Sequence, residues 1–439
     1  MPHRKNPSSR FPAMFRPPFR SLLILPLLIV PASANEALDV LEGRREASDV
    51  QLSPGAVPGS SAKTKVIYPE QQWPASPLDP FWKRSVIHDD PDNPYVQKVA
   101  VTGSFELRGG WGEVNGGDDG TLDSTRTRRA RLGTRMRVFR NTDIEATAEL
   151  AGGSGHHGIE RLSARTEIRP GTSVTYGKFR PKFTTEYATE EELLPFPDRA
   201  MLTNLLAPAR TLGVMFNHQR DEWDYGLGWF SGDTDPWFPG FEGPGFVAMN
   251  IGRTFVEMSG GQPMRTRWHL DFIHNFDPGG SSRFDVAGRR SANGGQLVTS
   301  NPAFRHLLST GISMEAGRFG FDGDFMIGRG DSTVWGMTLS PYYWAIPGKL
   351  RVVGRYHMAE SDDPGALVAT TGVSSDLQFD DTPFSIGDEY HSFYLGANWH
   401  IDQNHLVFMS GLEHATLNDD AGGGFDTDSW IWHAGARLS

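Results

Sequence analysis

The chain of 439 residues contains no cysteine, which excludes disulfide bonds and thiolate metal sites. After residue 34 it also lacks any apolar run near the roughly 20 residues that a membrane-spanning helix requires. There is no phosphate-binding glycine loop, dinucleotide-binding fingerprint or zinc protease signature. We therefore expect no enzyme activity, no cofactor and no metal site.

Positive charge is scarce overall, and much of it lies at the N-terminus. Five basic residues precede the apolar stretch Leu22–Val30, and Ala32-Ser33-Ala34 then offers a small-x-small cleavage pattern. This arrangement predicts a signal peptide over residues 1–34 and export from the cytoplasm. Its removal would lower the formal net charge of −11 by five, to −16. Such an acidic chain is not expected to bind nucleic acid, so any preference for anions must come from local placement of basic groups.

Two further regions follow the predicted signal peptide. Residues 35–98 are rich in proline and charge, and we expect a periplasmic extension that is partly disordered. From residue 99 to 439, segments of roughly ten residues with weak alternation follow one another, which is typical of a transmembrane β-barrel. The sixteen segments are about 99–111, 126–140, 143–151, 159–169, 172–178, 210–219, 222–231, 246–256, 265–276, 305–316, 319–327, 333–343, 349–360, 388–400, 404–416 and 427–438.

The connections between these segments are mostly short and long in turn. Short periplasmic turns and long extracellular loops alternate in this way in bacterial outer-membrane barrels, whereas a soluble β-sandwich has no reason to alternate. The sequence therefore predicts an all-β fold, an antiparallel transmembrane barrel of about sixteen strands.

In one segment, arginines alternate with mostly apolar residues. It reads RTRRARLGTRMRVFR over residues 126–140, and the side chains of a strand alternate between two faces. The even positions from Ala130 to Val138 are mostly apolar and suit lipid, so the odd positions are predicted to face the lumen. Guanidinium groups bind oxyanions bidentately, and a ladder of them favours anions in a pore. The odd positions hold Arg129, Arg131, Arg135 and Arg137.

A structural role for the same arginines is the alternative. The next segment carries acids on its odd face, and a turn at 140–142 would pair Arg137 with Glu145. A turn at 141–143 would instead pair Arg135 with Glu149. Such pairs stabilise a sheet by roughly 0.2–1 kcal/mol each. Arg129 and Arg131 lie beyond most of the acids, so we expect them to be the freest.

Basic residues continue beyond this ladder. Arg161 and Arg165 extend the odd-face pattern, and the long connection 178–210 can fold into the lumen and narrow it. Its acidic residues are as numerous as its basic residues, so the sequence does not show whether the constriction carries a positive or a negative net charge. The basic residues of this constriction loop are Lys178, Arg180, Lys182, Arg199 and Arg210.

Four stretches carry a family resemblance. GKFRPKFTTE at 177–186, FPDRA at 196–200, LAPARTLGV at 206–214 and RRARLG at 128–133 together resemble the phosphate-selective porin O/P family. The resemblance covers roughly residues 95–439 and is strongest over 126–220. It implies a sixteen-stranded, trimeric outer-membrane barrel in which an arginine ladder leads anions to a constriction.

We therefore expect an outer-membrane porin for passive diffusion of anions such as phosphate through an arginine-lined lumen. Its expected partners are outer-membrane lipid and lipopolysaccharide, small anions and two further copies of the chain. A general porin with mostly paired arginines is the alternative. A barrel enzyme and a plugged structural barrel are further alternatives, and bilayer conductance separates them from a porin.

Overall fold

The structure is a computed structural model of the whole chain. It describes residues 76, 78–115, 120–151, 158–233, 235–241, 243–259, 262–278, 304–363, 366–368, 386–418 and 426–439. All of them lie in the second of two units, Leu52–Ser439. The expected signal peptide and most of the expected extension lie outside the described residues, so the division at residues 34 and 98 stays a prediction.

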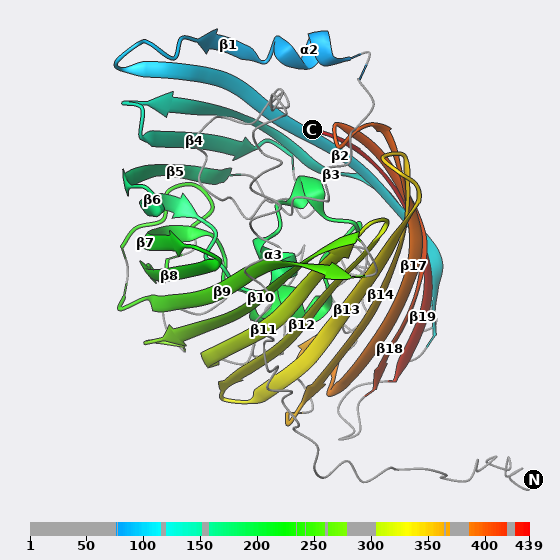
Figure 1. The fold of residues 1–439 in the computed structure, drawn as a ribbon. Helices are drawn as coiled ribbons and strands as arrows, with labels where there is room; N and C mark the ends of the chain where they lie inside the picture. The colour runs from blue at the N-terminus through cyan, green and yellow to red at the C-terminus, as the bar shows by residue number, and fades with distance from the viewer. Residues whose placement is uncertain are drawn as a thin grey trace, which may run out of the picture. The chain divides into compact units, whose positions relative to one another are not determined.

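Sixteen antiparallel strands form a closed barrel (Figure 1). Each strand pairs with the next along the chain, and the last strand pairs with β2 to close the ring. Every predicted segment overlaps one strand, which confirms the fold class. The strands are β2 (Val96–Asn115), β3 (Gly120–Val138), β4 (Thr142–Glu149), β5 (Gly158–Arg169), β6 (Thr172–Phe179), β7 (Thr211–Arg220), β8 (Trp223–Phe230), β9 (Phe246–Ser259), β10 (Gln262–Asn275), β11 (Phe304–Ala316), β12 (Phe319–Gly330), β13 (Thr333–Ile346), β14 (Leu350–Ser361), β17 (Glu389–Asp402), β18 (Leu406–Asn418) and β19 (Thr427–Leu438).

The connections separate the two ends of the barrel. One end, here called the short-turn end, has turns of two or three residues throughout, such as 139–141 and 170–171. The other, the long-loop end, holds the longest connections, including 180–210 and 276–303. A separate two-stranded sheet of β15 (Leu367–Val368) and β16 (Ile386–Gly387) lies in the connection between β14 and β17. This asymmetry is the one that the sequence predicts.

Residues just before the barrel complete its edge at the short-turn end. β1 (Val86–Asp89) pairs with the first part of β2, while β19 pairs with β2 only from Phe105 onward. β1 therefore covers backbone that β19 does not reach, which protects an otherwise open sheet edge. In α2 (Asp79–Lys83), Trp82 Nε1 donates to Asp402 Oδ2 at 2.6 Å, and its ring stacks on His405.

The predicted registers of β3 and β4 are wrong. Arg135 pairs with Glu145 and Arg137 with Asp143, because the chain already reverses at 139–141. Phe139 and Arg140 have left-handed backbone angles, with φ of 52° and 63°. Residues of these types rarely adopt that conformation, so the sequence does not mark the turn.

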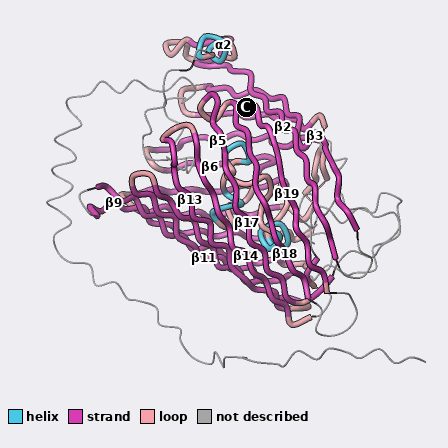
Figure 2. Tube along the Cα trace, turned by 90° about the vertical axis from the view of Figure 1, so that its right-hand side faces the viewer, coloured by secondary structure: helices cyan, strands magenta, loops and turns pink. Residues whose placement is uncertain are grey.

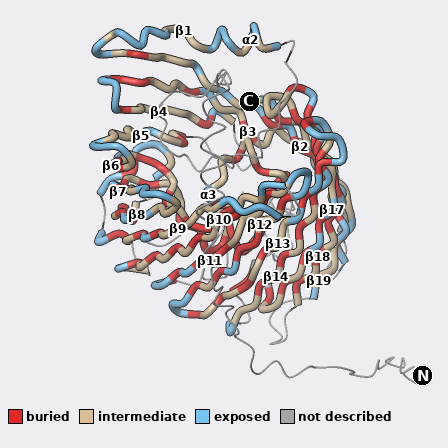
Figure 3. Tube along the Cα trace, viewed as in Figure 1, coloured by how far each residue is buried: buried red, intermediate tan, exposed pale blue. Residues whose placement is uncertain are grey.

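On strands such as β14 the two faces differ in burial as the alternation predicts (Figure 3). On β3, Leu132 is 55% exposed on the outer face, whereas Arg129 on the inner face is 5% exposed. Among the described residues, no helix is long and apolar enough to cross a membrane.

Candidate functional site

The segment from Arg180 to Arg210, between β6 and β7, lies inside the barrel. It contains α3 (Thr185–Ala188), the 3-10 helix η2 (Glu191–Leu193) and α4 (Met201–Leu206). In two perpendicular views these helices lie within the ring of strands (Figures 1 and 2). We call this segment the lumen loop. Its position confirms that the connection folds inward, and the contacts below show that it spans the lumen from wall to wall.

An apolar surface anchors one side of the lumen loop. Leu202 and Leu206 of α4 are fully buried, in a cluster with Met326 of β12 and Val334 of β13. The wall approaches closely because Gly328 has no side chain, and a Cβ there would lie 2.6 Å from Leu206 Cδ2. Burying two leucines stabilises the docked loop by roughly 1.5–3 kcal/mol each, relative to exposure.

Two aspartates hold the same side of the loop through its backbone. Thr184 N–H donates to Asp271 on β10 at 2.9 Å, and Thr185 N–H donates to Asp324 on β12 at 3.1 Å. Both carboxylates also lie near His269 Nε2, at 3.4 and 3.2 Å. These N–H groups begin α3, where a helix leaves its first donors unpaired, so the wall carboxylates supply the missing acceptors.

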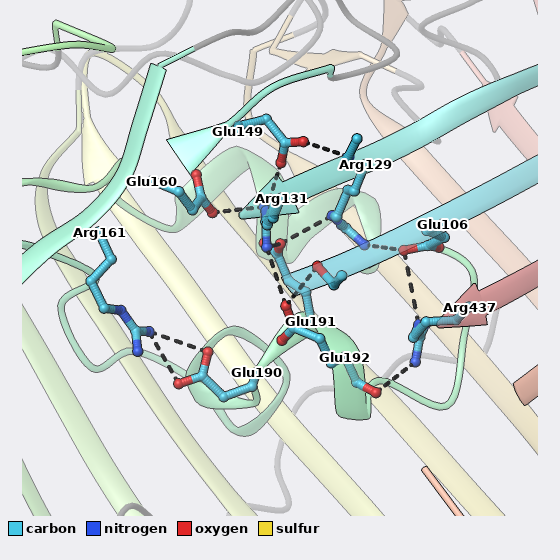
Figure 4. A network of polar contacts seen from close by, with 12 residues as sticks. Glu106, Arg129, Arg131, Glu149, Glu160, Arg161, Glu190, Glu191, Glu192 and Arg437 are labelled. Atoms are coloured by element: carbon cyan, nitrogen blue, oxygen red, sulfur yellow. Dashed lines mark hydrogen bonds and ion pairs between the residues drawn. The ribbon is translucent and has the colours of Figure 1, made fainter. Parts of the chain in front are cut away.

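Glu191 of η2 joins the loop to the opposite wall (Figure 4). Its side chain is buried, and its carboxylate lies 3.0 Å from Arg129 Nε and 2.5 Å from Arg131 Nη1, both on β3. Three arginines of the loop itself surround the other oxygen, Oε1. These are Arg180 at 2.7 Å, Arg199 at 2.8 Å and Arg210 at 3.6 Å.

The electrostatics of Glu191 follow from these contacts. Burial alone would raise the pKa of its carboxyl group, but the guanidinium groups, led by Arg129 and Arg131, outweigh burial and hold the pKa well below the ordinary value of 4.5. Glu191 is therefore a carboxylate at every physiological pH, and it neutralises part of the positive charge around it.

Arg129 and Arg131 also form ion pairs with carboxylates of the barrel wall. Arg129 also binds Glu106 at 2.6 Å, and Arg131 also binds Glu149 at 2.6 Å and Glu160 at 2.7 Å. The prediction that these two arginines are the freest of the ladder is therefore wrong. Acids from the loop, β2, β4 and β5 reach these arginines. Most of them are distant along the chain, and Glu149 was assigned to Arg135 by the wrong register.

The remaining ladder residues are paired within the wall or with the loop. Arg135 binds Glu145 at 3.0 Å, and Arg137 binds Asp143 at 2.8 Å. Arg161 binds Glu145 at 2.9 Å and Glu190 of the loop at 3.1 Å, while Arg165 Nε donates to Ser173 Oγ at 3.0 Å.

The basic residues predicted for the constriction loop mainly form structural contacts, and Lys178 among them lies in β6. Lys178 Nζ donates to two carbonyl oxygens, those of Asp235 and Pro236 at 2.8 Å each. Lys182 lies 3.9 Å from Asp224 on β8. Arg180 and Arg199 donate to loop carbonyl oxygens as well as to Glu191, and Arg210 pairs with Glu160.

Several arginines near the lumen loop escaped the sequence pattern, among them Arg355 on β14, which pairs with Glu186 of the loop at 3.1 Å. Arg108 on β2 and Arg128 on β3 both pair with Asp198 of the loop. A bulge at Arg128 shifts the register, so that Arg126 rather than Thr127 continues the inner face. The consecutive arginines at 128 and 129 do not by themselves indicate that bulge. Arg437 on β19 donates to Glu192 and Leu194 carbonyl oxygens at 3.0 Å each.

Arginines outnumber carboxylates in the ion pairs that centre on Glu191 and Asp198 of the loop. Two adjoining ion-pair clusters, one on Glu191 and one on Asp198, together hold eight arginines and six carboxylates. A cavity of about 210 Å³ opens beside them, and its basic lining residues are Arg131, Arg135, Arg161 and Arg210. The acidic lining residues are Glu145, Glu160, Glu190 and Glu192.

Comparison with known proteins agrees with this architecture. Residues 102–237 match the family model of phosphate-selective porin O and P, which confirms the resemblance over that part of the chain. The barrel is similar to an anion-selective porin from Comamonas acidovorans, with 10% identity, 77% of this chain and 99% of that chain covered, and a TM-score of 0.51. OprB of Pseudomonas putida has 11% identity, with 77% and 94% covered and a TM-score of 0.48. No curated protein matches the chain.

At such low identities the likeness to solved structures shows the fold alone. The family match covers residues 102–237, which is less than a third of the chain.

Proposed function

We propose that the chain is an outer-membrane porin, a channel rather than an enzyme, which lets small anions diffuse passively through the space between the lumen loop and the walls, with phosphate or related oxyanions favoured. The observation that carries the proposal is the ratio of eight arginines to six carboxylates in the two clusters that centre on Glu191 and Asp198 of the loop. Guanidinium groups remain charged at all relevant pH values and match the geometry of oxyanions. No cofactor or energy source is part of the proposal.

The ion pairs of the ladder arginines change which arginine we expect to contact the permeating anion. Arg129 and Arg131 hold Glu191 and so position the loop. Arg135 is the better candidate for contact with anions, because its side chain is 32% exposed, it lines the cavity, and it forms an ion pair with Glu145 on the wall rather than with the loop. Arg161 and Arg165 continue the route on β5.

The test is the current through single channels in planar bilayers. We expect Arg135→Gln to weaken block of the chloride current by phosphate about tenfold, the effect of losing one charge-assisted hydrogen bond. Arg220→Gln makes the same charge change at an exposed turn of the short-turn end and serves as the control. Equal phosphate block in both variants, or a current carried mainly by cations, would contradict the proposal.

A pore without phosphate preference is the second candidate. It is favoured by the carboxylates that bind Arg129, Arg131, Arg135, Arg137 and Arg161, since a paired guanidinium attracts a solute less strongly. An anion current that phosphate does not block would select this candidate. Trimeric assembly, export by a signal peptide and binding of lipopolysaccharide stay predictions.

A further inference from the structure

Basic side chains also gather on the outer surface of the barrel, far from the ladder in sequence. His274 on β10, His306 on β11 and Arg329 on β12 are direct register partners on three adjacent strands. They therefore form a row across the sheet, with strands about 4.8 Å apart. The row faces outward, because the neighbouring residues Ile273 and Leu307 are the fully buried, inward ones.

A bulge adds a fourth basic group to this row. The register shifts between Phe304 and His306, so Arg305 and His306 are both exposed although they are consecutive. The two histidine rings are in contact, with Nδ1 atoms 3.3 Å apart. We call His274, Arg305, His306 and Arg329 the outer basic row.

The arginines of the outer basic row differ from those of the lumen. Among the described residues, no carboxylate forms an ion pair with Arg305 or Arg329, whereas Arg129, Arg131 and Arg135 each bind at least one. An exposed guanidinium retains its full capacity to donate to an anion.

The position of the outer basic row along the strands indicates which kind of anion it binds. The next outward row toward the short-turn end is apolar and consists of the register partners Phe272, Leu308 and Ile327. The two rows are two residues apart along each strand, about 6.6 Å. A change from an apolar to a basic row over that distance is expected where the hydrocarbon of a bilayer meets its headgroups.

We infer that the outer basic row binds the phosphate of a lipid headgroup, whose acyl chains lie against Phe272, Leu308 and Ile327. The inference rests on the proposed location of the barrel in an outer membrane. It assigns a lipid rather than free phosphate, because the row lies on the outer surface and adjoins an apolar row that a free anion would not use.

The experiment compares lipids that differ only in phosphate. The full chain, refolded in detergent, is titrated with phosphatidic acid and with a diacylglycerol of the same acyl chains, and bound lipid is counted by native mass spectrometry. We expect phosphatidic acid to bind more tightly. Replacing both arginines, R305Q with R329Q, should weaken that binding about 30-fold and leave diacylglycerol binding unchanged. R220Q with R318Q, which removes two exposed charges at the short-turn end, should have no effect.

Three outcomes would overturn the inference. They are equal binding of the two lipids, equal phosphatidic acid binding by R305Q/R329Q and wild type, and displacement of phosphatidic acid by inorganic phosphate at matched concentration. Retention of folded, heat-modifiable mobility on gels shows that the double variant still forms a barrel. Because neither arginine faces the lumen, its chloride conductance should equal that of wild type, which separates failure of this inference from failure of the proposed channel function.

Discussion

Replacing Glu191 by glutamine tests the claim that one carboxylate holds the lumen loop against the arginine wall. The glutamate is 5% exposed and has five guanidinium groups within 3.6 Å of its oxygens. Glutamine has nearly the same shape but no charge, so Arg129 and Arg131 would face Arg199 and Arg210 without the shared anion. We therefore expect the loop to leave the wall far more often in Glu191→Gln.

The size of the effect follows from the burial of the ion pairs. Removing one partner of a buried pair costs about 3–5 kcal/mol, because it leaves an uncompensated buried charge. Applied to undocking of the loop, this raises the population of the undocked state roughly a hundredfold to a few thousandfold. The barrel strands, which do not depend on Glu191 for their backbone pairing, should remain folded.

Hydrogen exchange of the amides in residues 184–206 measures the undocking directly. Glu190→Gln is the matched control: the side chain of Glu190 is 36% exposed and pairs with Arg161 at 3.1 Å. Exposed pairs contribute about 0–1 kcal/mol, so exchange should rise less than about fivefold in this variant. Similar exchange in the Glu191 variant and its control would refute the reasoning, as would exchange that rises in the strands as much as in the loop.

Three further outcomes follow from the same contacts. The contribution of Glu191 to loop docking should be constant from neutral pH down to about 4.5, its ordinary pKa, and decline below that value toward the lowered pKa of the docked state; hydrogen-exchange protection that falls already near neutral pH would contradict this. Asp324→Ala leaves buried loop N–H groups without an acceptor and should weaken docking by about 1–3 kcal/mol, measured by the same exchange, with unchanged protection as the opposing result. Gly328→Ala places a methyl group against Leu206 and Phe304 and should weaken docking by about 1–3 kcal/mol. If fluctuations of the channel current and hydrogen exchange of the loop amides are both unchanged, the wall shifts to accommodate the methyl group.

The barrel could be predicted from the sequence because its signals are local. Alternation along each strand and the contrast between short and long connections gave sixteen segments that all overlap strands. The register of β3 and β4 could not, since it depends on left-handed backbone at Phe139 and Arg140 rather than on a residue type that favours a turn. A shift of two residues keeps every side chain on its face, so the alternation does not report the error.

The site was predictable only in part, because its ion pairs join residues that lie far apart along the chain. The arginines were visible as a pattern on one strand, but Glu191 lies sixty residues from Arg131 and reaches it only because the loop crosses the lumen. The bulge at Arg128 was hidden for a different reason. A run of arginines on both parities fits an alternating strand and a bulged one equally well, so Arg126 and Arg128 were not assigned to the inner face.

The position of the loop and the charge of the pore arise from the same residues. The loop presents a carboxylate, Glu191, to the arginine wall, and backbone N–H groups to Asp271 and Asp324 on the opposite wall. The loop is thus held by arginines of β3 on one side and by aspartates of β10 and β12 on the other. A charge change at Arg131 must therefore alter selectivity and loop docking together. Arg135 binds a wall carboxylate instead, so it is the residue at which the two effects can be measured apart.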